Sequence, residues 1–420
     1  MRVRAAMGVP AAALLAGALS SAASPAALGI ASRLPHLSAR EALALQPDTG
    51  EVIYARHADR RVPIASTTKL MTALLTLERG SLSRRLTVVA YHALPAESTA
   101  GLRPGERLTV RDLLRALLLA SANEAADTLA RRQARSIGAF VALMNRRARA
   151  LRLTSTHYSN PVGLDERGNY SSAADLLKLT RVLMTDRFFA HTVALRRARL
   201  ISGARSRTVV NRNTLVQDVS YVRGVKTGHT LAAGYVLVGA ARRHGVTVLS
   251  AVLGDPSEKA RNADSLALLR YGLGRYRRVA VLRHDQVLAR VALRFRSGQT
   301  VALVPRHAVR VLVRVGQRPQ IRLAGIPHEL DGPLALGARA GSASVSVGGR
   351  VVARVDLVTS RALAAASLGR RLSSYVSRPG TLLLLGGLAG CSLLLVALRR
   401  RVARRGAALE HSRTGSRTTA

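Results

Sequence analysis

Hydrophobic positions recur with different periods in the two halves of the chain. Between residues 41 and 274, segments such as 110–119 and 140–145 repeat apolar residues every three to four positions, which predicts helices. Short apolar runs at 235–240 and 246–252 alternate with these helical segments and predict strands. The mixture indicates an α/β (α+β) domain in this part of the chain.

Near residue 275 the period shortens to two. Apolar and polar residues alternate in 309–315, which predicts a strand, and similar runs at 345–347 and 351–355 flank Gly348-Gly349 and predict a hairpin. We expect a second, smaller all-β domain here. It contains no group of titratable residues that suggests chemistry, so its expected role is spacing or contact with substrate or partner.

The two ends carry the longest apolar runs. Near the start, Arg2 and Arg4 precede an apolar stretch and then small residues, the order of a secretory signal peptide. An uncleaved anchor is the alternative there. Residues 381–398 are uncharged, would span about 27 Å as a helix, and precede a run of arginines. Basic residues beside a span favour the cytoplasmic side, so we expect one membrane crossing with the body of the protein outside.

These patterns predict the following parts of the chain. They are a signal peptide (1–27), the α/β domain (36–275), the β-rich domain (276–359), a linker (360–378), a transmembrane helix (379–398) and a basic cytoplasmic tail (399–420).

Composition changes how the charges are interpreted. The net charge is +42, but aromatic residues make up 3% of the chain and the arginines are spread along it, so no nucleic-acid partner is expected. An anionic membrane or wall polymer suits this charge better. Only four lysines occur, Lys69, Lys178, Lys226 and Lys259. Because lysine can lose its proton near neutral pH and arginine cannot, each retained lysine is a candidate for proton chemistry.

Three short motifs carry the candidate chemistry. Ser66 and Lys69 open an apolar-periodic run, where one helical turn would let the amine take the proton of the hydroxyl. Taken alone, this spacing also fits a helix cap beside a surface lysine. Ser121 and Asn123 follow an apolar helix and could point into one cleft, while Lys-Thr-Gly at 226–228 precedes a strand-like run. Each of these could also be an ordinary cap or turn.

In this order, Ser-x-x-Lys, Ser-x-Asn and Lys-Thr-Gly resemble the penicillin-binding proteins and serine β-lactamases. Segments 101–114, 121–126, 160–165 and 226–230 are similar to the low-molecular-mass D-alanyl-D-alanine carboxypeptidases. The resemblance implies a penicillin-binding, β-lactamase-like domain with a helical subdomain and a central antiparallel sheet. It also implies removal of the terminal D-alanine from peptidoglycan pentapeptide stems and covalent inhibition by β-lactam antibiotics. No metal and no cofactor are expected.

The resemblance assigns roles to side chains. Ser66 would attack the penultimate D-alanine to form an acyl-enzyme, and Lys69 would accept its proton with a pKa that the second cation, Lys226, helps to lower. Ser121 and Asn123 would relay a proton to the leaving amine and hold Lys69 and the substrate amide. The implied substrate-binding residues are Lys226, Thr227, Gly228, His229, Thr230 and Arg261, with the backbone N–H groups of Ser66 and His229 forming the oxyanion hole. For Arg261, a solvated surface position is the alternative.

Three other functions compete with this interpretation. A class A β-lactamase carries Asp between the Ser and Asn of the second motif, where this chain has Ala122, although Asp165 and Glu166 are conceivable deacylation residues. A catalytically silent, membrane-tethered wall-binding protein would not need all the motif residues intact. A metallo-carboxypeptidase would need a ligand spacing that the 11 histidines do not form. A serine D-alanyl-D-alanine carboxypeptidase is therefore the expected function.

Overall fold

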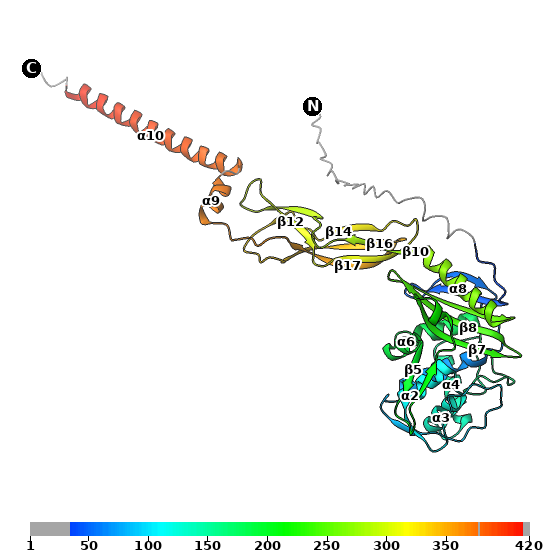
Figure 1. Ribbon diagram of the computed structural model, residues 1–420. Coiled ribbons are helices and arrows are strands. Elements are labelled where there is room, and N and C mark those ends of the chain that lie inside the picture. Colours follow the sequence, from blue (N-terminus) through cyan, green and yellow to red (C-terminus); the bar gives the residue numbers. More distant parts are fainter. Residues whose placement is uncertain (1–33, 377–378, 415–420) are drawn as a thin grey trace, which may run out of the picture. The chain divides into compact units, whose positions relative to one another are not determined.

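The computed structural model of the chain describes residues 34–376 and 379–414, which fall into two compact units, Met1–Arg277 and Arg278–Ala420 (Figure 1). The predicted signal peptide, residues 1–27, lies outside the described residues, as does the end of the predicted tail. Its presence stays a prediction.

The first unit is built on a five-stranded antiparallel sheet with the order β2-β1-β9-β8-β7. Its strands are β1 (Glu41–Gln46), β2 (Glu51–Arg56), β7 (Val222–Thr230), β8 (Gly234–Arg243) and β9 (Val246–Asp255). The apolar runs at 235–240 and 246–252 lie in β8 and β9, as predicted. Side chains on both faces of these strands are buried, which explains why the runs are apolar throughout and do not alternate.

Helices cover both faces of the sheet. On one face, α8 (Glu258–Arg275) packs so closely on β8 that a Cβ added to Gly239 would lie 2.6 Å from the Ser265 hydroxyl. On the other, α5 (Ala173–Leu183) contacts β1 and β9. The remaining elements of the unit are η2 (Ala65–Thr68), α1 (Lys69–Arg79), β3 (Arg85–Thr87), β4 (Arg107–Thr109), α2 (Val110–Arg115), η3 (Ala116–Ala120), α3 (Asn123–Gln133), α4 (Ile137–Ala150), α6 (Arg187–Val193), β5 (Arg197–Leu200), β6 (Arg207–Val210) and α7 (Leu215–Asp218). The predicted mixed α/β domain with a central antiparallel sheet is confirmed.

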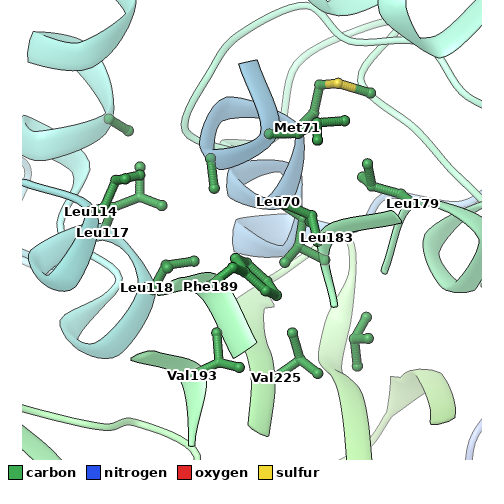
Figure 2. Close-up of a cluster of buried hydrophobic side chains, with 14 of the residues drawn as sticks. Leu70, Met71, Leu114, Leu117, Leu118, Leu179, Leu183, Phe189, Val193 and Val225 are labelled. Carbon is green, nitrogen blue, oxygen red and sulfur yellow. The ribbon is translucent and has the colours of Figure 1, made fainter. Parts of the chain in front are cut away.

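The main hydrophobic core of this unit lies directly behind two of the candidate motifs. Figure 2 shows Leu70 and Met71 of α1 among leucines of α2, η3 and α5, with Phe189 and Val193 of α6 and Val225 of β7. Leu70 follows Lys69 in the chain, and Val225 precedes Lys226. Fully burying such side chains stabilises the fold by about 2 kcal/mol each, so the backbone that carries both lysines is held firmly.

The second unit is all-β as far as Thr359, as the two-residue alternation predicts. A six-stranded sheet has the order β14-β16-β17-β12-β11-β15, and β10 pairs with β13. The predicted hairpin is β16 and β17, which pair from Val347 and Arg350 outward. The strands are β10 (Tyr276–Leu282), β11 (Ala289–Leu293), β12 (Thr300–Pro305), β13 (Val309–Arg314), β14 (Gln320–Ala324), β15 (Glu329–Leu330), β16 (Arg339–Val347) and β17 (Arg350–Thr359).

Two helices follow the strands. Within the predicted linker, α9 (Leu368–Val376) forms a short helix, so this segment is not irregular throughout. The long helix α10 (Pro379–Thr414) contains a stretch, Pro379–Arg404, that is long and apolar enough to cross a membrane, and its most apolar window of 18 residues has a mean hydropathy of 2.3. The helix continues past the arginine run that was expected to begin the tail.

Candidate active site

Ser66 and Lys69 form a hydrogen-bonded pair. Ser66 lies in the 3-10 turn η2 and Lys69 is the first residue of α1, so the hydroxyl sits one turn ahead of the α-helix and does not open it. Lys69 Nζ donates to Ser66 Oγ at 2.8 Å and to the carbonyl of Val162 at 2.5 Å. Ser66 is partly exposed, whereas the exposed fraction of Lys69 is 0%. The arrangement joins an accessible hydroxyl to a buried amine.

The loop at 160–165 supports this pair from the side. Asn160 Oδ1 accepts the backbone N–H groups of Val162 and Gly163 at 3.2 and 2.6 Å and so folds the loop onto itself. Gly163 has a φ of 90°, and an added Cβ would lie 2.0 Å from the carbonyl oxygen of Ala65. Only glycine therefore lets this loop approach the turn that carries Ser66 and place the Val162 carbonyl against Lys69.

The second and third motifs form another serine–lysine pair. Ser121 has a left-handed conformation, with a φ of 61°, between η3 and α3, and its Oγ accepts from Lys226 Nζ at 2.9 Å. Lys226 Nζ also donates to the Thr227 carbonyl at 2.8 Å. On the same strand, a Cβ added to Gly228 would lie 2.9 Å from the Ser66 nitrogen. The three motifs predicted from the sequence therefore meet at one place, beside the edge strand β7.

Burial lowers the pKa of both lysines. For Lys69, desolvation by burial is the largest cause and lowers the pKa to about 7; the carboxylates of Glu97 and Glu124 act against it, and the charge of Arg212 acts with it. Burial also lowers the pKa of Lys226 well below its usual value, assisted by the charge of Lys69. The expected direction for Lys69 is correct, but its main cause is burial and not the neighbouring lysine.

The polar residues after Lys226 are engaged in different ways. Thr227 is buried, and the ring of the exposed His229 stacks on Tyr235 at a centroid distance of 4.0 Å. Thr230 Oγ1 donates to Asp165 at 2.7 Å, so its hydroxyl already has a partner.

Arg261 does not occupy the solvated surface position that was the alternative for this residue. It is buried, donates to Glu258 at 2.7 Å and to Asn262, and its guanidinium carbon lies 5.9 Å from the centre of the Tyr235 ring. Tyr235 therefore contacts both Arg261 and His229, which places this arginine at the same end of β7 as the last residues of the third motif.

Asp165 and Glu166, the two carboxylates considered for deacylation, both accept hydrogen bonds from other groups of the protein. Asp165 accepts from Thr230 and from the backbone N–H of Ala232, and Glu166 accepts from Asn160 Nδ2 at 2.8 Å. Glu166 Oε1 accepts no hydrogen bond within the described residues, but neither carboxylate is bonded to Ser66 or Lys69 there.

Sequence reasoning missed the charged groups that surround the two lysines. Glu97 accepts hydrogen bonds from Asn123 and Tyr91, and Glu124 and Arg212 act on the pKa of Lys69. One signal could have drawn attention to the glutamates. The chain has 23 acidic residues against 65 basic ones, and Glu124 directly follows Asn123 of the second motif.

Comparisons with known proteins agree with this geometry. A family model described as D-alanyl-D-alanine carboxypeptidase matches residues 29–257, and one described as the C-terminal domain of penicillin-binding protein 5 matches residues 276–365. The chain is 30% identical to the D-alanyl-D-alanine carboxypeptidase DacF of Bacillus subtilis over 292 residues, covering 68% of this chain and 75% of that one.

Solved structures of similar proteins point to the same fold. The DD-transpeptidase of Streptomyces K15 is 32% identical with a TM-score of 0.53, covering 57% of this chain and 98% of that one. Penicillin-binding protein 5 of Haemophilus influenzae, at 24% identity and a TM-score of 0.56, covers 79% of this chain and 99% of its own and shows the fold alone. The chain therefore belongs to the D-alanyl-D-alanine carboxypeptidase family of serine peptidases.

Proposed function

We propose that the protein removes the terminal D-alanine from peptidoglycan stem peptides through an acyl-enzyme on Ser66. The observation that carries this proposal is the 2.8 Å hydrogen bond between Ser66 Oγ and Lys69 Nζ, an amine that is fully buried. With a pKa of about 7, Lys69 is partly neutral at physiological pH and can accept the hydroxyl proton. The partly exposed hydroxyl is then an activated nucleophile.

Acylation and deacylation use the residues around this pair. Ser66 Oγ attacks the carbonyl carbon of the penultimate D-alanine while its proton passes to Lys69. The backbone N–H groups of Ser66 and His229 hold the oxyanion, and the C–N bond breaks as the leaving amine takes a proton delivered through Ser121. Asn123 holds the substrate amide. Water then hydrolyses the ester and restores the Ser66 hydroxyl.

The free carboxylate of the substrate is held at the end of β7. Arg261, next to Tyr235, supplies positive charge at this end of β7, and the Lys226 amine, buried beside Ser121, supplies N–H donors. Thr227 and Thr230 supply hydroxyls, with Gly228 leaving room between them. Because Thr230 donates to Asp165 without substrate, binding a carboxylate would exchange this partner for the ligand.

The same site would react with β-lactam antibiotics, which carry an acylating carbonyl and a carboxylate. Turnover of penicillin as a β-lactamase requires an efficient base for deacylation. Neither Asp165 nor Glu166 is bonded to Ser66 or Lys69 within the described residues, which favours a long-lived acyl-enzyme over rapid hydrolysis. The relatives are named carboxypeptidases, which also supports a carboxypeptidase over a β-lactamase.

The helix α10 would tether the enzyme to the membrane with its catalytic unit outside the cytoplasm. Leucines along its span, such as Leu383 and Leu393, are exposed to the surroundings, as lipid-facing residues are. Arg399, Arg400 and Arg401 follow the apolar part, and basic residues favour the cytoplasmic side. A chain truncated before residue 379 should leave the membrane fraction; if it stays there, α10 is not the anchor.

The function is tested by release of D-alanine from a pentapeptide analogue. We expect the full-length protein in detergent to release D-alanine and Ser66→Ala to release none, because no other hydroxyl is bonded to Lys69 among the described residues. Ser83→Ala removes an exposed hydroxyl bonded to Ser81 and serves as the matched control, with full activity. Release by Ser66→Ala would reject Ser66 as the nucleophile.

A further inference from the structure

We propose that Glu97 is a positioning residue of this site, which sets the orientation of the Asn123 amide and provides a negative charge beside the Ser66–Lys69 pair. The proposal rests on the proposed function. It concerns a residue outside the three motifs, on the segment between β3 and β4.

The carboxylate of Glu97 accepts hydrogen bonds from three residues. Its Oε2 accepts Asn123 Nδ2 at 2.6 Å and the hydroxyl of Tyr91, and its Oε1 accepts the Leu94 N–H at 3.2 Å. An ionised carboxylate accepts hydrogen bonds but donates none. The Asn123 side chain must therefore turn its nitrogen towards Glu97 and its oxygen away from it.

This orientation leaves a defined group free on Asn123. Its Oδ1 makes no hydrogen bond within the described part of the chain, whereas its Nδ2 faces Glu97 and Tyr91. Asn123 with a fixed amide therefore offers a substrate amide N–H its acceptor oxygen. With the amide reversed, Nδ2 would point where the structure has Oδ1.

The backbone around Glu97 is hydrogen-bonded to the first turn of α3, which begins with Asn123. The Ser98 carbonyl accepts the Asn123 N–H at 2.8 Å, and Glu124 Oε1 accepts the N–H groups of Ala100 and Leu102 at 2.7 and 3.3 Å. Segment 97–102 is thus tied to the first turn of α3 by side chains and backbone. Glu97 holds Asn123 as part of this connection, and not as a mobile surface residue.

The charge of Glu97 also acts on the pKa of Lys69, the proposed base. Partial burial alone would raise the pKa of Glu97, but hydrogen bonds from Tyr91 and Asn123 and the charge of Lys69 outweigh it and lower the pKa. The ionised carboxylate in turn raises the pKa of Lys69, together with Glu124 and against Arg212. Removing the charge should therefore make Lys69 neutral at a lower pH than in the wild type.

The test is the second-order rate of acylation by fluorescent penicillin, measured on the full-length protein from pH 5 to 9. Glu97→Gln can offer Asn123 either an oxygen or a nitrogen, so it no longer selects one orientation, and we expect acylation to slow by about tenfold or more at pH 8. We also expect the acidic limb of the profile to move to lower pH. Glu97→Asp keeps the charge on a shorter side chain, so it should slow acylation with little displacement of that limb.

A matched control removes another glutamate charge of the same unit. Glu78 pairs with Arg147 at 2.6 Å near the end of α1 opposite to Lys69, and Glu78→Gln should keep the wild-type rate and profile. Wild-type rate and profile in Glu97→Gln would overturn the proposal, and so would a slower rate with no movement of the acidic limb. If Glu97→Gln does not fold, equal rates for Glu97→Asp and wild type overturn the positioning role. Failure of the wild type to label at all would reject the proposed function instead.

Discussion

The two units bury different kinds of side chain, although arginine is abundant in both. The first unit buries Lys69, Lys226 and Arg261 together with the acids Asp255 and Asp264. In the described part of the second unit, Thr359 is the one polar residue that is buried, and its hydroxyl donates to the Ala335 carbonyl. Its core is otherwise formed by valine, leucine and alanine side chains.

This difference distinguishes the charged groups that can take part in chemistry from those that only carry surface charge. Burying a charged group costs several kcal/mol unless it is paired, so a fold keeps such groups inside only where something offsets the cost. In the first unit each buried lysine is hydrogen-bonded to a serine, and the hydrophobic core behind them supplies the compensating stability. The exposed arginines of both units carry most of the net charge but make no comparable arrangement. Buried lysine is therefore the informative feature, and the second unit lacks it within its described residues.

Replacing the buried lysine should have the largest effect. In Lys69→Arg the side chain remains cationic at any accessible pH, so it cannot accept the Ser66 proton, and acylation by penicillin should fall by about 10³-fold. Lys178→Arg is the control, because Lys178 is exposed and pairs with Asp175 at 2.9 Å. Acylation in Lys69→Arg within tenfold of wild type would show that the buried amine is not the base.

A core substitution in the second unit should affect stability and not chemistry. Leu303 is fully buried in β12, and Leu303→Ala should lower the free energy of unfolding of that unit by about 3 kcal/mol through loss of packing. Denaturant unfolding followed by circular dichroism measures this change. The acylation rate at Ser66 should stay within about twofold of wild type. A large loss of acylation in the folded variant would mean that the second unit takes part in the reaction.

The buried acid Asp255 should make the stability of the first unit depend on pH. Burial first, and then a hydrogen bond with the Asp264 carboxyl and the charge of that group, raise its pKa from 3.8 to about 8. The folded state therefore holds a proton that the unfolded state loses, and the free energy of unfolding falls as pH rises from about 4 to about 8.

Asp255→Asn removes this titration. Its free energy of unfolding relative to wild type should increase by about 3 to 4 kcal/mol between pH 5 and pH 8, measured by denaturant unfolding. Asp285 offers the contrast in the second unit, because it is fully exposed and the hydrogen bond from Arg283 lowers its pKa. Asp285→Asn should differ from wild type by the same amount at both pH values. Equal behaviour of the two variants would remove Asp255 as a source of pH dependence.

Much of this architecture could be predicted from sequence, because local patterns determine it. The change of period near residue 275 predicts the all-β unit, and the runs that form β8 and β9 are readable directly. The three motifs could be found because each is a short local pattern. Burial of Lys69 could not be predicted, since it depends on packing against segments such as Val162, 93 residues away.

The contacts of Glu97 and Arg261 escaped prediction for a similar physical reason. Glu97 meets Asn123 from an irregular segment with no periodicity, and Arg261 reaches the site by contact with Tyr235 on another element. In a chain with so many arginines, only the tertiary structure distinguishes Arg261 from those on the surface.

The most direct test is to locate the adduct that penicillin forms on the wild-type chain. The full-length protein is treated with benzylpenicillin, digested with trypsin and sequenced by tandem mass spectrometry, where cleavage after Arg61 and Lys69 isolates a peptide containing Ser66. We expect one stoichiometric penicilloyl group, on Ser66. An adduct on Ser121 or any other residue, or no adduct at all, would contradict this expectation.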